Sequence, residues 1–80
     1  MKTAPMIELV KDNFAEFAFF RDGTMYYNIV KPTGEKVAFF PIDVTSKEEI
    51  GNACFNTKDK AITLMRYIRR AIKDETIFIM

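Results

Sequence analysis

Residues 14–42 read FAEFAFFRDGTMYYNIVKPTGEKVAFFPI, and this stretch decides the fold of the 80-residue chain. Two turn sequences divide it into three runs of apolar and β-favouring residues. Asp22-Gly23 suits a type I′ hairpin turn because both residues accept positive φ angles. In residues 31–35, Pro32 supplies a fixed φ and Gly34 a left-handed residue, as a three-residue hairpin loop requires. The stretch therefore predicts a three-stranded antiparallel meander.

Counting outward from the two turns assigns each side chain to a face, since successive side chains of a strand point to opposite sides. This register pairs Phe19 with Tyr26, and Tyr27 with Phe39. We expect the more continuously apolar face to form the core: Phe14, Glu16, Ala18, Phe20, Met25, Tyr27, Ile29, Val37, Phe39 and Pro41. The opposite face would centre on four aromatic residues, with polar neighbours around them: Phe17, Phe19, Tyr26 and Phe40, bordered by Arg21, Asn28 and Lys36.

A C-terminal helix is expected to cover the core face. Apolar residues recur at helical spacing between Lys58 and Asp74, which predicts one apolar stripe: Ala61, Leu64, Met65, Ile68, Ala71 and Ile72. We expect Leu64, Met65, Ile68 and Ile72 to meet Phe20, Tyr27, Ile29 and Phe39 of the sheet. Residues 77–80 are apolar and β-favouring, so they predict an edge strand or an exposed tail.

Three shorter segments complete the expected fold. Residues 6–10 predict a short strand, residues 46–51 one helical turn with capping-box spacing, and residues 53–55 a short edge strand. No repeat or linker interrupts the chain, so we predict a single domain over residues 1–80. Its class would be α+β: a mainly antiparallel sheet of three to five strands with one C-terminal amphipathic helix packed on one face.

Composition favours a small folded protein of the cytoplasm. Hydrophobic residues make up 49% of the chain and aromatic residues 14%, which argues against disorder. We find no signal-peptide pattern and no run near the ~18 apolar residues of a membrane span, so no membrane is expected. The single cysteine, Cys54, fits a reducing compartment. A domain this small without disulfides often gains stability by oligomerising, which suggests a homodimer.

The residue types that usually carry catalysis are missing. The chain has no histidine, so the commonest general base and metal ligand is absent, and Cys54 lacks the usual thiolate partner. Gly23, Gly34 and Gly51 are too far apart for a phosphate-binding loop. The carboxylates do not cluster with metal-ligand spacing. We therefore predict no catalytic residues, no metal site, no cofactor and no enzyme activity.

A net charge of +1 conceals a basic segment. Residues 58–73 hold six positive and one negative side chain, which gives +5 and leaves −4 on the rest of the chain. Four cations lie opposite the apolar stripe of the expected helix: Arg66, Arg69, Arg70 and Lys73. Such a face is most often simply solvated, but arginine's planar fork suits carboxylate and phosphate groups. An acidic body would repel a nucleic-acid duplex, so an acidic protein partner is favoured over DNA.

The four-residue aromatic group, Phe17, Phe19, Tyr26 and Phe40, admits three interpretations. It could form a second core layer under another part of the chain. It could instead contact a second copy or another protein, because exposed apolar patches usually mark interfaces. The third interpretation is a base-stacking platform for single-stranded nucleic acid.

These observations lead to one functional hypothesis and two alternatives. We expect a non-enzymatic protein-interaction module, homodimeric, that binds an acidic protein partner through the arginine-rich helix face, the aromatic sheet face, or both. The first alternative is single-stranded nucleic-acid binding through the aromatic face. The second is an accessory or inhibitory factor of a phage or mobile element acting on a host protein, an analogy of size and composition alone.

Overall fold

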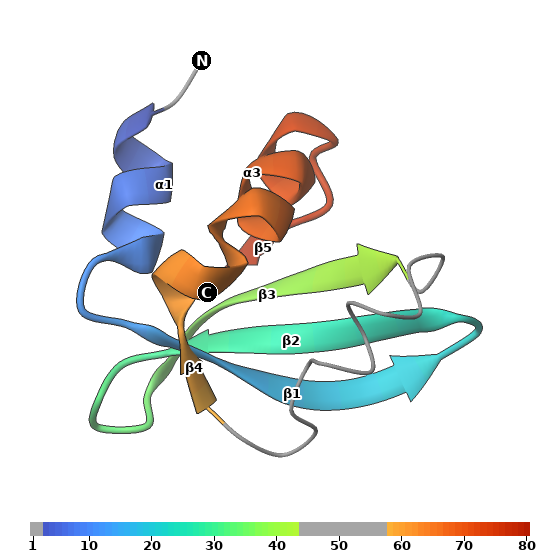
Figure 1. The fold of residues 1–80 in the computed structure, drawn as a ribbon, viewed down its shortest axis with the longest axis horizontal. Helices are drawn as coiled ribbons and strands as arrows, with labels where there is room; N and C mark the ends of the chain where they lie inside the picture. The colour runs from blue at the N-terminus through green and yellow to red at the C-terminus, as the bar shows by residue number, and fades with distance from the viewer. Residues whose placement is uncertain (1–2, 44–57) are drawn as a thin grey trace.

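The computed structural model describes residues 3–43 and 58–80 and shows a five-stranded antiparallel sheet with helices on one side (Figure 1). The strand order is β4-β1-β2-β3-β5. The elements in chain order are α1 (Thr3–Val10), β1 (Phe14–Arg21), β2 (Thr24–Val30), β3 (Lys36–Asp43), β4 (Lys58–Lys60), the 3₁₀ helix η1 (Ala61–Leu64), α3 (Met65–Lys73) and β5 (Phe78–Ile79). This confirms the α+β class, the antiparallel sheet and the C-terminal helix on one face. The segments predicted over residues 46–51 and 53–55 lie outside the described residues.

Both hairpin turns form where the sequence places them. Asp22 and Gly23 have φ angles of 50° and 81°, the left-handed conformation that a type I′ turn requires. Gly34 has φ 97°, and the Lys31 N–H donates to the Glu35 carbonyl at 2.8 Å to close the second loop. The three-stranded meander is therefore confirmed.

The predicted register holds near each turn and then shifts by one residue. In the first hairpin Phe19 faces Tyr26 as predicted, but Phe17 faces Tyr27, because Ala18 is an extra residue in a β-bulge. In the second hairpin Val30 faces Lys36, whereas Ile29 faces Ala38, because Val37 is the extra residue. Each bulge changes which side chains of its strand face the helices.

The predicted division of the sheet into two faces was therefore partly wrong. Phe40, expected on the outer face, is completely buried in the core, and Phe17 packs against that core from the same side. Phe39 and Pro41, expected in the core, occupy the alternate positions of β3 and belong to the outer face. Phe20 does lie on the core side, opposite Met25, but it is 56% exposed and does not belong to the buried core.

The core lies between the sheet and the helices. Its buried residues come from the sheet and from every helix on that side. They are Leu9 of α1; Ala15, Met25, Tyr27, Ile29, Ala38, Phe40 and Ile42 of the sheet; Ala61 of η1; and Ile68 and Ala71 of α3. Leu64 and Ile72 pack against this cluster. Ile68 of the predicted stripe shares this cluster with Tyr27 and Ile29, whereas Phe39 lies on the other side of the sheet.

Residues 6–10 form the end of α1, so the predicted strand was wrong. Met6, Leu9 and Val10 pack against the core, and their spacing of three and four residues places them on one side of a helix. The side-chain amide of Asn13 donates to the carbonyl oxygens of Glu8 and Leu9, each at 3.3 Å. These bonds satisfy carbonyl groups that the helix end leaves unpaired.

The C-terminal helix begins later than predicted. Residues 58–60 have no apolar side chain for the core, and their backbone instead pairs with Phe14–Glu16 as edge strand β4. The Ala61 N–H then donates to the Asn13 carbonyl at 3.0 Å, where η1 leads into α3. At the other end Phe78–Ile79 pairs with Ala38 and Phe39, which confirms the edge strand over the exposed tail.

The end of α3 forces a non-glycine residue into a left-handed conformation. Thr76 N–H donates to the Ala71 carbonyl at 2.8 Å and Glu75 N–H to the Ile72 carbonyl at 3.2 Å, the bond pattern of a Schellman motif. Glu75 occupies the position where glycine is usual, with φ 58°. A side chain in this region costs ~1–2 kcal/mol.

We expect Glu75→Gly to raise the free energy of unfolding by about 0.5–1 kcal/mol, because relief of the left-handed strain exceeds glycine's entropic cost. Urea denaturation measures the change. Glu75→Ala is the control, since it removes the same charge but keeps the strain. An equal gain in both variants would show that charge, not backbone conformation, is responsible.

Adjacent phenylalanines test the corrected faces. Phe40→Ala should destabilise the fold by about 3–5 kcal/mol, as expected for a buried aromatic residue. Phe39→Ala should cost less, about 1–2 kcal/mol, because this half-buried ring loses only its stacking contacts with Phe19, Tyr26 and Phe78. Denaturation monitored by circular dichroism gives both values, and a larger loss for Phe39 would contradict the assignment.

Candidate functional site

Four aromatic side chains gather on the outer face of the sheet, one from each of four adjacent strands. We call Phe19, Tyr26, Phe39 and Phe78 the outer aromatic cluster. The ring centroids lie 4.8 Å apart for Phe19 and Tyr26, and 5.2 Å apart for Tyr26 and Phe39. Phe39 and Phe78 follow at 6.2 Å. The cluster thus forms a continuous apolar strip across β1, β2, β3 and β5.

The cluster is partly open to solvent. Phe19 is 40% exposed and Phe78 59%, and the described helices all lie on the other side of the sheet (Figure 1). The planes of Tyr26 and Phe39 differ by 6°, and those of Phe19 and Tyr26 by 20°. Near-parallel rings at these distances are offset-stacked, so each covers part of its neighbour's face. The surface offered to a ligand is therefore a packed apolar strip rather than a row of separate flat rings.

Cations border the cluster. Strand alternation and register place four of them on the outer face: Arg21, Lys36, Lys58 and Lys60. Lys60 Nζ lies 4.4 Å from the ring centroid of Phe14, a cation–π contact that confirms its side of the sheet. Two carboxylate residues, Glu16 and Asp43, also occupy outer-face positions, opposite Lys58 and Thr24. Four cations against two carboxylates give the outer-face positions a net positive charge.

The open edge of the sheet beside β5 is unsuited to pairing with another strand. Val37 accepts a hydrogen bond from the Met80 N–H at 2.9 Å, so alternate residues of β3 direct their backbone groups toward that edge. In the described part of the chain, β5 pairs with Ala38 and Phe39 and leaves the edge beyond them open. Pro41 lies there and has no N–H to donate. The broad face, rather than this edge, carries the exposed aromatic side chains.

The predicted sheet-face residues divide between the two sides of the sheet. Phe19 and Tyr26 belong to the outer aromatic cluster, whereas Phe17 stacks edge-on against Tyr27 at 5.8 Å on the core side. Phe40 is buried and cannot contact a partner from the surface. Phe39 and Phe78 were missed. Their positions depend on the one-residue bulge at Val37 and on the pairing of the C-terminal strand. The turn sequences predict neither feature.

All four predicted helix-face residues are exposed: Arg66, Arg69, Arg70 and Lys73. They lie on α3, across the sheet from the outer aromatic cluster (Figure 1). Within residues 3–43 and 58–80, Arg69, Arg70 and Lys73 have no ion-pair partner, and the ion pair found there joins Lys31 and Glu35 at 3.4 Å. Of the four cations, Arg70 alone lines the pocket described next.

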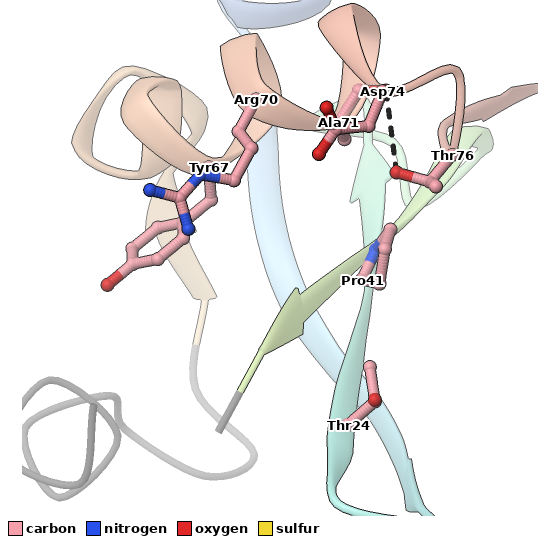
Figure 2. A pocket seen from close by; sticks show the side chains of 7 residues that line it. All are labelled: Thr24, Pro41, Tyr67, Arg70, Ala71, Asp74 and Thr76. Atoms are coloured by element: carbon pink, nitrogen blue, oxygen red, sulfur yellow. Dashed lines mark hydrogen bonds between the residues drawn. The ribbon is translucent and has the colours of Figure 1, made fainter. Parts of the chain in front are cut away.

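A pocket of about 310 Å³ lies between the end of α3 and the edge of β3. Figure 2 shows Arg70 and Tyr67 on one side, Asp74 and Thr76 above, and Pro41 and Thr24 below. The Thr76 hydroxyl donates to the Ala71 carbonyl at 3.4 Å, and this bond ties Thr76 to the end of α3. Opposite charges thus flank a pocket whose floor combines the Pro41 ring with the Thr24 hydroxyl.

We expect Pro41→Val to promote self-association, because it restores an N–H group to the open edge of β3. Light scattering over a concentration series should show a higher molar mass than for the unmodified chain. Pro41→Lys is the matched control, since it restores the same N–H but adds an edge charge that opposes strand pairing. An unchanged mass for Pro41→Val would show that this proline does not protect the edge.

The chain matches no protein-family model, no curated protein and no solved structure. Among the described residues, no helix is long and apolar enough to cross a membrane. In the same residues, no group of His, Cys, Asp and Glu side chains is placed to hold a metal ion. The outer aromatic cluster, its cationic border and the neighbouring pocket are the features that bear on function.

Proposed function

We propose that the chain is a non-enzymatic protein-interaction module that binds its partner through the outer face of the sheet. The observation that carries the proposal is the exposed outer aromatic cluster, with Phe19 at 40% and Phe78 at 59% exposure. Contiguous exposed apolar side chains on a small domain usually mark a binding surface, and aromatic residues are enriched at the centres of interfaces. We place the module in the cytoplasm because its single cysteine fits a reducing compartment.

The cationic border favours a partner with acidic groups around an apolar patch. Arg21, Lys36, Lys58 and Lys60 occupy outer-face positions of the same sheet and outnumber the two carboxylate residues there, Glu16 and Asp43. Complementary charge speeds encounter and suppresses wrong partners. Two copies meeting through this face would bring like charges together, which argues for a different protein. The homodimer expected from the sequence stays a prediction, and light scattering tests it.

Single-stranded nucleic acid is the second candidate, because the same cations could follow a phosphate backbone past the aromatic rings. We rank it lower because the rings of Tyr26 and Phe39 cover part of each other's stacking surface. Fluorescence anisotropy with a labelled mixed-sequence oligonucleotide at low salt tests this candidate. Binding that weakens steeply with salt and is lost in Phe39→Ala would put it first.

The protein-binding proposal can be tested with peptides selected from a random 12-residue phage library on the immobilised full chain. We expect Phe19→Ser and Phe39→Ser each to weaken the selected peptides by about tenfold or more, as at the centre of an interface. Fluorescence polarisation with synthetic peptides measures the dissociation constants.

Phe20→Ser is the matched control, because Phe20 is a comparably exposed aromatic residue next to Phe19 but on the core side. It should change affinity less than twofold, with circular dichroism confirming that all three variants fold. Equal losses in Phe20→Ser and Phe19→Ser, or no enriched peptides, would refute the outer face as the binding surface.

A further inference from the structure

We propose that the pocket beside α3 receives an acidic side chain of the same partner, held by Arg70. The inference rests on the proposed function, because it assigns the partner a second contact next to the outer aromatic cluster. It also divides the arginine-rich helix face: Arg70 binds the partner, whereas Arg69 is solvated. The evidence is the position of the pocket, the charges that flank it and its size.

The pocket adjoins the outer aromatic cluster. Pro41 on its floor is the direct register partner of Tyr26, and Thr24 lies two residues before Tyr26 on the same side of β2. Pro41 likewise follows Phe39 by two residues on β3. A bound segment that covers Tyr26 and Phe39 therefore needs to extend only past Pro41 to reach Arg70. The cluster and the pocket form one continuous surface that passes around the open edge of β3.

Arg70 is not neutralised by the nearest carboxylate in the pocket. Arg70 and Asp74 are one helical turn apart, yet they form no ion pair in the described part of the chain. An acid placed C-terminal to a base at this spacing is the less favourable order on a helix. Figure 2 shows the Arg70 side chain extending away from Asp74, alongside Tyr67. The guanidinium group is therefore available to an incoming carboxylate, which its planar fork can bind through two parallel hydrogen bonds.

The rest of the lining suits a short acidic side chain. Pro41 and Ala71 offer apolar surface to its methylene groups, and the Thr24 hydroxyl can donate to a carboxylate oxygen. A volume of about 310 Å³ is at the lower end for ligand pockets, which fits a single side chain better than a cofactor. The negative charge of Asp74 repels an incoming carboxylate. Removing that charge should therefore strengthen binding of an acidic peptide, whereas removing the Arg70 charge should weaken it.

The test uses the peptides selected on the outer face, each made with its acidic residue and with the matching amide. Arg70→Ala should weaken the acidic peptide by about five- to tenfold, a range that allows for solvent exposure of the pair. It should leave the amide peptide within twofold. Asp74→Asn should strengthen the acidic peptide by about two- to threefold. Arg70→Lys should recover only part of the loss, because lysine lacks the planar fork.

Arg69→Ala is the matched control, since Arg69 is an equally exposed arginine on the same helix outside the pocket. A comparable loss in Arg69→Ala would mean that the helix acts only through its overall charge, and it would overturn the inference. Selected peptides without acidic residues, or an equal effect of Arg70→Ala on acid and amide peptides, would overturn it too. If Phe39→Ser weakens binding and Arg70→Ala does not, the proposed function stands without this contact. If neither has an effect, both fail.

Discussion

The two β-bulges, at Ala18 and Val37, determine which face of the meander each side chain occupies. Strand side chains alternate with a period of two, so one extra residue reverses the sides of everything beyond it. Through these two residues Phe40 is buried under the helices, while Phe39 joins Phe19 and Tyr26 outside. The core, the outer aromatic cluster and the floor of the pocket all follow from this placement.

Chain length explains why the described helices cover only one face of the sheet. A domain of 80 residues buries only ~60–65% of the surface that its unfolded chain exposes, and here α1, η1 and α3 share one side of the sheet. The aromatic residues of the other side stack on one another, which shields part of their surface. A cationic border keeps this side polar at its margins. The fold thereby combines a buried core with a partly exposed aromatic surface.

Turn chemistry made much of the fold predictable from the sequence, because Asp22-Gly23 and Gly34 specify their backbone conformation locally. The apolar stripe from Ala61 to Ile72 likewise predicted which side of the helix packs on the sheet. Residues 6–10 were misjudged, because a run of five residues fits a strand or a helix until its packing partner is known. The candidate site was half predicted: Phe19 and Tyr26 follow from the first turn. Phe39 does not, because a bulge depends on how whole strands pack and has no local sequence signal.

The bulges also bear on how the length of this chain can vary. Ala18 has no partner of its own in β2, so removing it would leave Phe17 opposite Tyr27 and Phe19 opposite Tyr26. Deletion of a paired strand residue would instead transfer every side chain beyond it to the other face. Of the strand positions in β1, Ala18 is thus the one at which the meander can lose a residue and still bury the same side chains. A shortened relative would keep both the core and the outer aromatic cluster if its gap fell at this position.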